Sequence, residues 1–493
     1  MNLRCAQSAK PLLLLGLALL GVRPVWLPAQ QAWEDSGERL AEHQRLAREA
    51  EERQDFATAI KEYKALAAAV PSSAELRSNL GVALYFHRDY GLADAAFRRA
   101  LALKPDLYAP HLFLGLSLAQ QGQPDAAVPE LEKAVALNAA DPVAQAWLGY
   151  QYTAQARFEK AAAVLEAAAR LNPGDQDVWF ALGRSYVELG KVTTTQLIER
   201  MPDCGRVWQL AGEQSEAQGN SSRALKLYTA ALERRPDLDA LRGKVQALGG
   251  SVPAPKPELE KDAHEEDALY ARVEEYEQKA RGAFEQISRI DPDGYRAHQV
   301  LGDAAAAADQ NDEAIYEYAR VLERKPDLPG IHRALCAAYS HVAKVRDAVR
   351  ECEAELALSP ASADAYAEAA RVYLLTDDFD RAQALLEKAE SLDRPPTEVY
   401  KSLGKLYLGR GKYHEAVAAL NKYTAAKPRD VTAYYLLARA LRAVGDSAGA
   451  NRAIAEYQRR SSAAHTTNDA ERALGAGHGQ EADEDPQKGS DVL

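Results

Sequence analysis

Residues 142–175, PVAQAWLGYQYTAQARFEKAAAVLEAAARLNPGD, contain the pattern that decides the fold. Leu148 and Gly149 lie on a first predicted helix, and Ala161 lies on a second one. Pro173 then ends the second helix, because proline cannot continue a helix. The small residues allow two helix backbones to approach closely. The stretch therefore predicts two packed helices joined by a short turn.

The small residue at position 149 recurs at a fixed distance on both sides of this stretch. Small residues occupy equivalent positions in two runs, and within each run they are 34 residues apart. The first run is Ala47, Gly81, Gly115, Gly149 and Gly183, and the second is Gly302, Cys336, Ala370, Gly404 and Ala438. A fixed period of this length indicates an α-solenoid, in which each unit buries its apolar face against the next. The sequence therefore predicts an all-α fold made of stacked helical repeats.

The pattern inside each unit resembles the tetratricopeptide repeat, whose signature places Trp at position 4, Leu-Gly at 7 and 8, Tyr at 11, Ala at 20 and 27, Phe at 24 and Pro at 32. Residues 142–175 carry Leu148, Gly149, Tyr152, Ala161, Leu165, Ala168 and Pro173 at positions 7, 8, 11, 20, 24, 27 and 32. The resemblance covers residues 40–460. It implies helix-turn-helix repeats, about twelve in all, that form a right-handed superhelix. It also implies a protein that binds other proteins or peptides and catalyses no reaction.

Two interruptions divide this series of 34-residue repeats. After Gly190 comes a β-branched stretch at 192–195, and the next signature glycine, Gly212, follows Gly183 by only 29 residues. We expect the second helix of the repeat at 176–204 to be short or distorted, because β-branched residues disfavour helices.

The second interruption is a proline-rich linker. Residues 251–257 contain three prolines, which favour an extended chain. Beyond it, residues 273–279 lack a turn residue, which leaves a bent or a continuous long helix open there. The predicted organisation is a signal peptide at 1–29, a lead-in at 30–39, a first array with a covering helix at 40–248, a linker at 249–260, a second array at 261–460 and a disordered acidic tail at 461–493.

The N-terminus predicts an export signal. Arg4 and Lys10 precede an apolar run at 12–22, whose eleven residues are too few to cross a bilayer. Ala29 suits the last position before a cleavage site, although the residue two places earlier does not, so an uncleaved signal that holds the chain at the membrane is the alternative. We expect an exported protein, periplasmic or extracellular, with no integral membrane span after cleavage.

Charge limits the classes of partner. The formal net charge is −12, and it becomes −15 when the three cations of the leader are removed. Such a surface argues against nucleic acid and anionic membranes as general partners, because phosphate binding needs a basic surface.

Motifs for catalysis are incomplete in this sequence. Residues 264–267, HEED, lack the second histidine of a zinc-protease helix, and Gly404 and Gly409 are followed by Arg410 where a phosphate loop needs lysine. We therefore expect no catalytic residue, no cofactor and no metal site.

Histidines and cysteines recur at repeat positions. Histidine occupies position 4 in five units, at His43, His111, His264, His298 and His332. We favour the interpretation that these histidines pack where the family signature has Trp. A row of metal sites is less favoured, because imidazole rings one repeat apart are too distant to bind the same ion. The resemblance places Cys336 and Cys352 opposite each other, at positions 8 and 24 of one repeat. A disulfide and two free buried thiols both stay open there. Cys204 lies in the interrupted repeat and is expected to be exposed.

The resemblance assigns partner binding to the first helices, mainly at positions 2, 5, 9 and 12. In the first array these positions and their neighbours form an apolar face with Val82, Tyr85, Phe86, Leu112, Phe113, Leu116, Tyr150 and Phe180. So much exposed apolar surface would be unusual without a partner, although packing between repeats could bury part of it.

The same positions in the second array are basic. The predicted basic stripe consists of Arg333, Arg371, Lys401, Lys405, Arg439 and Arg442. Arg and Lys clusters bind carboxylates, which favours a partner with an acidic segment or, less strongly, the acidic tail around 481–485. The other interpretation is a solvated face paired with neighbouring acids.

These patterns favour a non-catalytic adaptor or scaffold that binds partner proteins. A structural or assembly role in an envelope complex, such as a secretion, pilus or polysaccharide-export apparatus, is the second interpretation. An enzyme of unrecognised type is a remote third.

Overall fold

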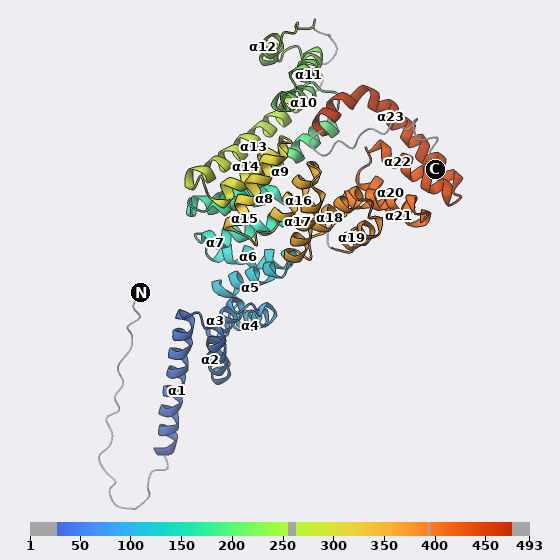
Figure 1. Ribbon diagram of the computed structural model, residues 1–493. Coiled ribbons are helices and arrows are strands. Elements are labelled where there is room, and N and C mark those ends of the chain that lie inside the picture. Colours follow the sequence, from blue (N-terminus) through green and yellow to red (C-terminus); the bar gives the residue numbers. More distant parts are fainter. Residues whose placement is uncertain (1–26, 255–262, 393–394, 476–493) are drawn as a thin grey trace, which may run out of the picture. The chain divides into compact units, whose positions relative to one another are not determined.

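The computed structural model describes residues 27–254, 263–392 and 395–475 (Figure 1). Every regular element in these ranges is an α-helix, and 23 helices follow one another along the chain. The predicted all-α repeat fold is therefore confirmed. Two compact units divide at Gln151 and Tyr152, within α7 and not at the predicted linker.

The first unit contains three helix pairs and most of α7. Its helices are α1 Leu27–Glu52, α2 Phe56–Ala69, α3 Ala74–Phe86, α4 Tyr90–Leu103, α5 Tyr108–Gln120, α6 Pro124–Leu137 and α7 Pro142–Ala154.

The second unit contains the remaining helices. They are α8 Phe158–Leu171, α9 Gln176–Arg200, α10 Gly205–Ala217, α11 Ser221–Arg234, α12 Asp239–Ala247, α13 Ala263–Ile290, α14 Tyr295–Ala307, α15 Asn311–Arg324, α16 Ile331–His341, α17 Val345–Leu358, α18 Ala363–Leu375, α19 Phe379–Ser391, α20 Thr397–Gly409, α21 Tyr413–Ala426, α22 Val431–Ala443 and α23 Ser447–Gly475.

A left-handed residue makes the turn inside each regular repeat. It occupies position 15 of the unit, and its φ lies between 56° and 85° in ten repeats, at Gln54, Arg88, Gly122, Ala156, Gly219, Asp309, Ala343, Asp377, Gly411 and Gly445. Six of these residues are not glycine and carry the steric cost of that conformation. The backbone geometry of the turn is thus retained even where the residue type does not favour it.

A small residue at position 8 lets the two helices of each repeat meet. A methyl group built on Gly115 would lie 2.6 Å from Cγ of Leu131, and one on Gly302 would lie 2.7 Å from the Tyr318 ring. Real Cβ atoms do not approach so closely, so any larger residue at these positions would push the helices apart.

The repeat at 176–204 does not follow this plan. Gly190 occupies the turn position, but it lies inside α9, which runs without a break from Gln176 to Arg200. The expected short or distorted helix is wrong. The threonines are accommodated because Thr193 Oγ1 donates to Leu189 O at 2.8 Å and Thr195 Oγ1 to Lys191 O at 2.9 Å.

The missing second helix of this repeat is supplied by α13, which packs along α9 (Figure 1). Gly183 meets the ring of Phe284 in the way that Gly302 meets Tyr318. Tyr186 and Tyr276 stack with ring centroids 6.2 Å apart. One repeat is therefore split between the start of α9 and the end of α13.

The 34-residue period continues on the far side of this split repeat. Gly183 and Gly302 are 119 residues apart, which is one 34-residue period plus 85 residues. We call the inserted residues 191–275 the arm. The predicted linker lies inside the arm, so it does not separate two arrays that pack independently. The two incomplete repeats at 176–204 and 261–292 combine into one.

The arm has its own core. Leu197 of α9, Trp208 of α10, Tyr228 of α11 and Val273 of α13 belong to one buried cluster. The predicted covering helix is present as α12, which buries Leu241 and Val245, among others, in the same cluster. The long helix at 263–290 is continuous, which is one of the two forms left open by the sequence.

Both ends of the described chain are helical. The helix α1 begins at Leu27, so most of the predicted signal peptide lies outside the described residues. At the other end, α23 continues to Gly475, and the expectation of disorder from residue 461 is wrong for the first fifteen residues. Residues 461–474 contain four alanines and no glycine or proline, which permits the helix. No described helix is long and apolar enough to span a membrane.

The split repeat predicts that the arm can be removed in phase. Deleting 191–275 joins Gly190 to position 276, where Tyr276→Asp restores the acidic cap that Asp378 provides at the start of α19. We expect a folded chain with cooperative thermal unfolding, because Gly190 can adopt the turn conformation. A deletion of 191–277 turns the second helix by about 200° and should aggregate or unfold at a lower temperature. Equal stability of the two variants by circular dichroism would contradict the split repeat.

Candidate functional site

The apolar face of the first unit centres on a group of aromatic rings. We call Phe56, Tyr85, Phe86 and Phe113 the aromatic cluster. Phe86, at the end of α3, stacks on Phe56 with centroids 5.3 Å apart and meets Phe113 edge-on at 5.9 Å. Tyr85 lies 5.4 Å from both Phe86 and Phe113. The Phe86 side chain stays 50% exposed despite these contacts.

The structure does not expose every residue predicted for this face. Leu112 and Leu116 are buried, with exposed fractions of 6% and 5%, so they cannot line an open surface. The reason is that α5 is flanked by α3, α4 and α6 and buries both of its faces. Val82 and Tyr150 are half-buried, and Tyr150 contacts the Trp147 ring at 5.8 Å.

Phe180 belongs to the second unit and has different contacts. Its ring lies 6.2 Å from Phe284 and 4.5 Å from the guanidinium of Arg296. Its packing in the split repeat explains its position, and it is not part of the aromatic cluster.

Two members of the predicted basic stripe are engaged within the protein. Lys401 pairs with Asp430 at 3.0 Å, and burial, which raises the pKa of that carboxyl, is outweighed by hydrogen bonds from Thr432 and by the charge of Lys401. Arg371 pairs with Glu368 at 2.5 Å and donates to Ser340 at 2.6 Å.

The other four stripe residues are exposed. Arg333 is exposed on α16, and Lys405 is exposed on α20. Arg439 and Arg442 lie on α22, exposed, and neither makes an ion pair with a described residue. Arg439 and Arg442 are therefore two exposed cations of the stripe on one helix.

The recurring histidines bind glutamates of their own repeats. In four repeats Nδ1 lies 2.5–2.7 Å from a glutamate 19 residues later, in the pairs His43–Glu62, His111–Glu130, His298–Glu317 and His332–Glu351. Each pair joins the first helix of a repeat to its second helix. The described residues include no group of three or more side chains arranged to hold a metal ion.

Cys336 and Cys352 form a disulfide in this structure, with Cα atoms 5.3 Å apart. Both residues are buried, and the bond joins α16 to α17 at the positions where other repeats place a small residue and a large apolar side chain. Cys204 is half-buried and not exposed as expected. Burial and the nearby Glu266 raise its pKa to about 12, which leaves the thiol weakly nucleophilic.

We predict that a non-reducing mass map of the purified protein will find the peptides of Cys336 and Cys352 linked. Reduction should lower the free energy of unfolding by about 2–4 kcal/mol, because the bridge restricts the unfolded chain. Chemical denaturation with and without reductant measures this, and Cys204→Ser is the control that should respond in the same way as wild type. Two free thiols in the native protein would contradict the bridge.

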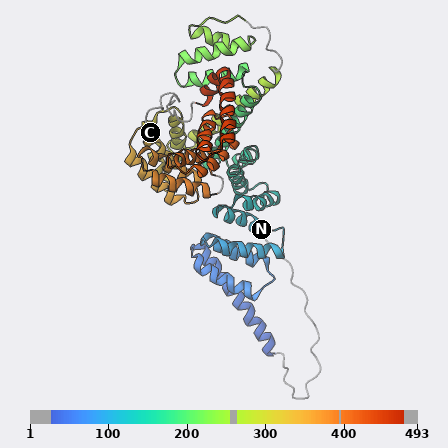
Figure 2. The same ribbon diagram turned by 90° about the vertical axis from the view of Figure 1, so that its right-hand side faces the viewer.

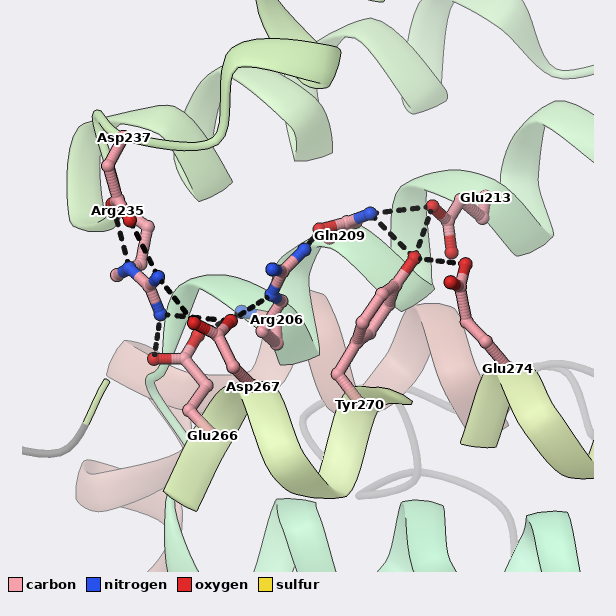
Figure 3. A network of polar contacts seen from close by, with 9 residues as sticks. All are labelled: Arg206, Gln209, Glu213, Arg235, Asp237, Glu266, Asp267, Tyr270 and Glu274. Atoms are coloured by element: carbon pink, nitrogen blue, oxygen red, sulfur yellow. Dashed lines mark hydrogen bonds and ion pairs between the residues drawn. The ribbon is translucent and has the colours of Figure 1, made fainter. Parts of the chain in front are cut away.

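A polar network that the sequence did not predict fastens the arm repeat to α13 (Figure 3). Arg235, 4% exposed, bonds to Asp237 at 2.7 Å, to Glu266 at 3.1 Å and to Asp267 at 3.0 Å. Arg206 also binds Asp267, at 2.7 Å. Glu266 and Asp267 belong to the HEED stretch, whose acids thus serve as partners of arginines on α10 and next to α11.

The network continues along α10 through a tyrosine. The Tyr270 hydroxyl lies 2.6 Å from Glu274 and 3.0 Å from Glu213, and Gln209 donates to that hydroxyl at 2.7 Å (Figure 3). Burial raises the pKa of Glu213, and hydrogen bonds from Gln209 and Tyr270 oppose that shift. A cavity of about 640 Å³ opens beside these residues, between α10, α12 and α13.

The ion pairs of this network join α13 to Arg206 on α10 and to Arg235, which follows α11. Cys204 lies beside Glu266 of this network, and burial together with that carboxylate raises the pKa of its thiol, which leaves it weakly nucleophilic. Sequence reasoning missed this network because its partners lie about 30 and 60 residues apart, so no local motif records them. The only signal was the acidic pattern at 266, 267 and 274, which is also typical of a solvated helix.

Family models describe most of the repeats. Models of the tetratricopeptide repeat match residues 45–108, 112–152, 142–185, 278–329, 363–396 and 402–465. The matched ranges lie on both sides of the arm. A search of curated proteins found no match.

Several solved structures resemble parts of the chain. A crystal structure of MamA is 23% identical and covers 33% of this chain and 95% of its own, with a TM-score of 0.31. MamA from Desulfovibrio magneticus RS-1, residue 41 to the end, is 20% identical over 41% of this chain and 99% of its own, with a TM-score of 0.29. YrrB, described as a TPR protein with an unusual peptide-binding site, is 20% identical over 44% and 96%, with a TM-score of 0.29.

Proposed function

Because the chain belongs to the tetratricopeptide repeat family, we propose that it is a non-catalytic adaptor that binds segments of partner proteins at two surfaces. Repeats of this family serve protein interaction in general. The observation that carries the proposal is the aromatic cluster, whose outer ring Phe86 remains 50% exposed. Exposed apolar groups gathered on one surface favour association, since covering them removes apolar area from water.

The first surface consists of the aromatic cluster and Val82. Phe56, Phe86 and Phe113 already support one another, so their rings are held in place before a partner arrives. Such preorganisation reduces the entropy lost on binding. A partner segment with apolar side chains suits this surface.

We predict that Val82→Ser with Phe86→Ser removes capture of partners by chemical crosslinking in the native cell, by about tenfold or more, as for interface hot spots. The control is Leu92→Ser with Leu103→Ser, because both leucines are exposed in the same unit, on α4. The control should keep the wild-type yield within about twofold. Equal losses in the two variants, with both chains folded, would contradict this surface.

The second surface consists of Arg439, Arg442 and the exposed Lys405 on the neighbouring first helix α20. Guanidinium groups bind carboxylates through charge-assisted hydrogen bonds, which favours an acidic partner segment. The ion pairs of Arg371 and Lys401 favour a structural role for those two residues instead.

We predict that Arg439→Glu with Arg442→Glu weakens binding of a labelled ten-residue glutamate peptide by at least about tenfold in Kd. Arg346→Glu with Lys388→Glu makes the same charge change at exposed sites on the second helices α17 and α19 and should have less than about a twofold effect. Fluorescence anisotropy at two salt concentrations measures both variants. If both variants weaken binding equally, the peptide responds to the overall charge of the protein and not to the basic stripe.

Export is part of the same proposal. The charge and apolar pattern of residues 1–29 supports a cleaved signal, and the Cys336–Cys352 bridge suits an oxidising compartment. The mass map described above, extended to the N-terminal peptide, tests this: a mature chain that starts at Gln30 supports export with cleavage, and an intact Met1 supports the anchored alternative. Self-association in light scattering would favour a scaffold of an envelope complex over a monomeric adaptor.

A further inference from the structure

The helix α13 contacts the inner positions of the repeat formed by α10 and α11, which we call the arm repeat. Counted from Gly205, Gln209 and Glu213 occupy positions 5 and 9, two of the positions to which the resemblance assigns partner binding. In the arm repeat they contact the Tyr270 hydroxyl of α13, at 2.7 and 3.0 Å. Figures 1 and 2 show the yellow-green α13 reaching the green helices of the arm. A segment of the chain itself thus takes the place of a partner.

The polar contacts around Tyr270 need one hydrogen more than its hydroxyl and Gln209 supply (Figure 3). Gln209 accepts from Arg206 through its oxygen, and its nitrogen donates to Tyr270 at 2.7 Å and to Glu213 at 2.8 Å. The Tyr270 hydroxyl lies 2.6 Å from Glu274 and 3.0 Å from Glu213, but it has a single hydrogen to donate. The shorter contact suits an ionised Glu274, because hydrogen bonds to carboxylates are short. The contact with Glu213 is then complete only when Glu213 carries a proton and donates it to the Tyr270 oxygen.

The surroundings of Glu213 favour this protonated form. Burial raises the pKa of the half-buried Glu213 carboxyl, and hydrogen bonds from Gln209 and Tyr270 oppose that shift. The charge of Lys244 on α12 also lowers this pKa, and the charge of Glu274 on α13 raises it. The net direction is upward, so Glu213 keeps its proton at a higher pH than an ordinary glutamate. The cavity of about 640 Å³ is lined by Glu213 and Tyr270, so the proton can exchange with water.

The helices packed against α10 bring further polar and charged groups near Glu213. Lys244 of α12 pairs with Glu216 at 2.9 Å, and the Tyr228 hydroxyl of α11 donates to Glu216 at 2.6 Å. The charge of Glu213 acts on Glu277 of α13, which is exposed. The charged residues of α23 with described side chains are Arg452, Glu456, Arg459 and Arg460, of which the last two bind Glu456. A proton on Glu213 therefore reduces the repulsion between carboxylates of α10 and α13.

We propose that Glu213 makes the contact between the arm repeat and α13 sensitive to pH. The protonated carboxyl donates to Tyr270 and holds α13 in place. When the proton leaves to water, the ionised carboxylate repels Glu274 and the contact loosens. A group whose pKa is raised by folding stabilises the folded state at low pH, and this contribution is lost as the pH rises through the folded value. The contact is therefore tighter in acid than at neutral pH, and it depends on neither of the two proposed partner surfaces.

Two other carboxylates of the arm stay ionised in the same range of pH. Burial, which raises the pKa of Asp267, is outweighed by hydrogen bonds from Arg235 and Arg206. Hydrogen bonds from Tyr228 and Lys244 lower the pKa of Glu216. Both groups thus keep their charge above the ordinary range of about 3.9–4.3 for carboxyl groups, and they contribute nothing to a change between about pH 5.5 and 7.5.

Amide exchange of α10 in the full chain, measured by mass spectrometry at about pH 5.5 and 7.5, tests the proposal. Glu213→Gln mimics the protonated carboxyl at both values. Comparing the two chains at the same pH cancels the intrinsic effect of pH on exchange. From the lower to the higher pH, exchange in wild type relative to this variant should become at least about threefold faster. Glu216→Gln is the matched control on the same helix, and the ratio of wild type to this control should stay within about 1.5-fold.

The possible results separate Glu213 from the general charge of the arm. A constant ratio of wild type to Glu213→Gln overturns the proposal. An equal change for Glu216→Gln overturns it as well, because the effect then belongs to any lost carboxylate. If Glu213→Gln does not fold, the exposed Glu274→Gln is the second test. It removes the competitor for the Tyr270 hydrogen and should reduce the wild-type response to pH by at least about twofold, whereas an unchanged response overturns the proposal. Loss of partner binding in any variant concerns the proposed surfaces and leaves these ratios as they are.

Discussion

Close contact between one small residue and one large side chain holds each pair of helices together, and the other features of the fold depend on it. In a regular repeat the two residues are 16 apart, as in Gly115 and Leu131. In the split repeat Gly183 meets Phe284, 101 residues later. The contact, and not the length of chain between the helices, thus defines a repeat. Cys336 and Cys352 keep the same two positions and join them covalently.

The turn inside the repeat decides where the chain goes next. Ten repeats place a left-handed residue there, which reverses the chain at once. At Gly190 the backbone stays helical, so α9 continues past the end of its repeat and the chain builds the arm before α13 returns. One residue in a different conformation therefore separates a repeat from an insertion. Arg235 and Arg206 hold the start of α13 in place, because their carboxylate partners lie there.

Packing also selects which predicted surface residues remain available to a partner. Leu112 and Leu116 are buried between neighbouring helices, whereas Phe86 keeps half of its surface in contact with water. In the basic stripe, Lys401 and Arg371 are neutralised by carboxylates of the same chain. Arg439 and Arg442 lack such partners among the described residues. The surfaces proposed for binding are therefore smaller than the sequence pattern suggested, and they lie in different units of the chain.

The sequence by itself determined the helical repeat, its period, the positions of close approach and the covering helix α12, because each depends on residues within one or two repeats. It also recorded the phase of the split repeat, since Gly183 and Gly302 differ by one period plus 85 residues. Only the tertiary structure decided that α13 completes the repeat begun by α9, that the arm is fastened by Arg235, and that α23 reaches α10. These contacts join residues from about 30 to more than 200 positions apart. A local pattern carries no record of such partners, because the same apolar and charged residues would suit several neighbours, and the folded chain selects one.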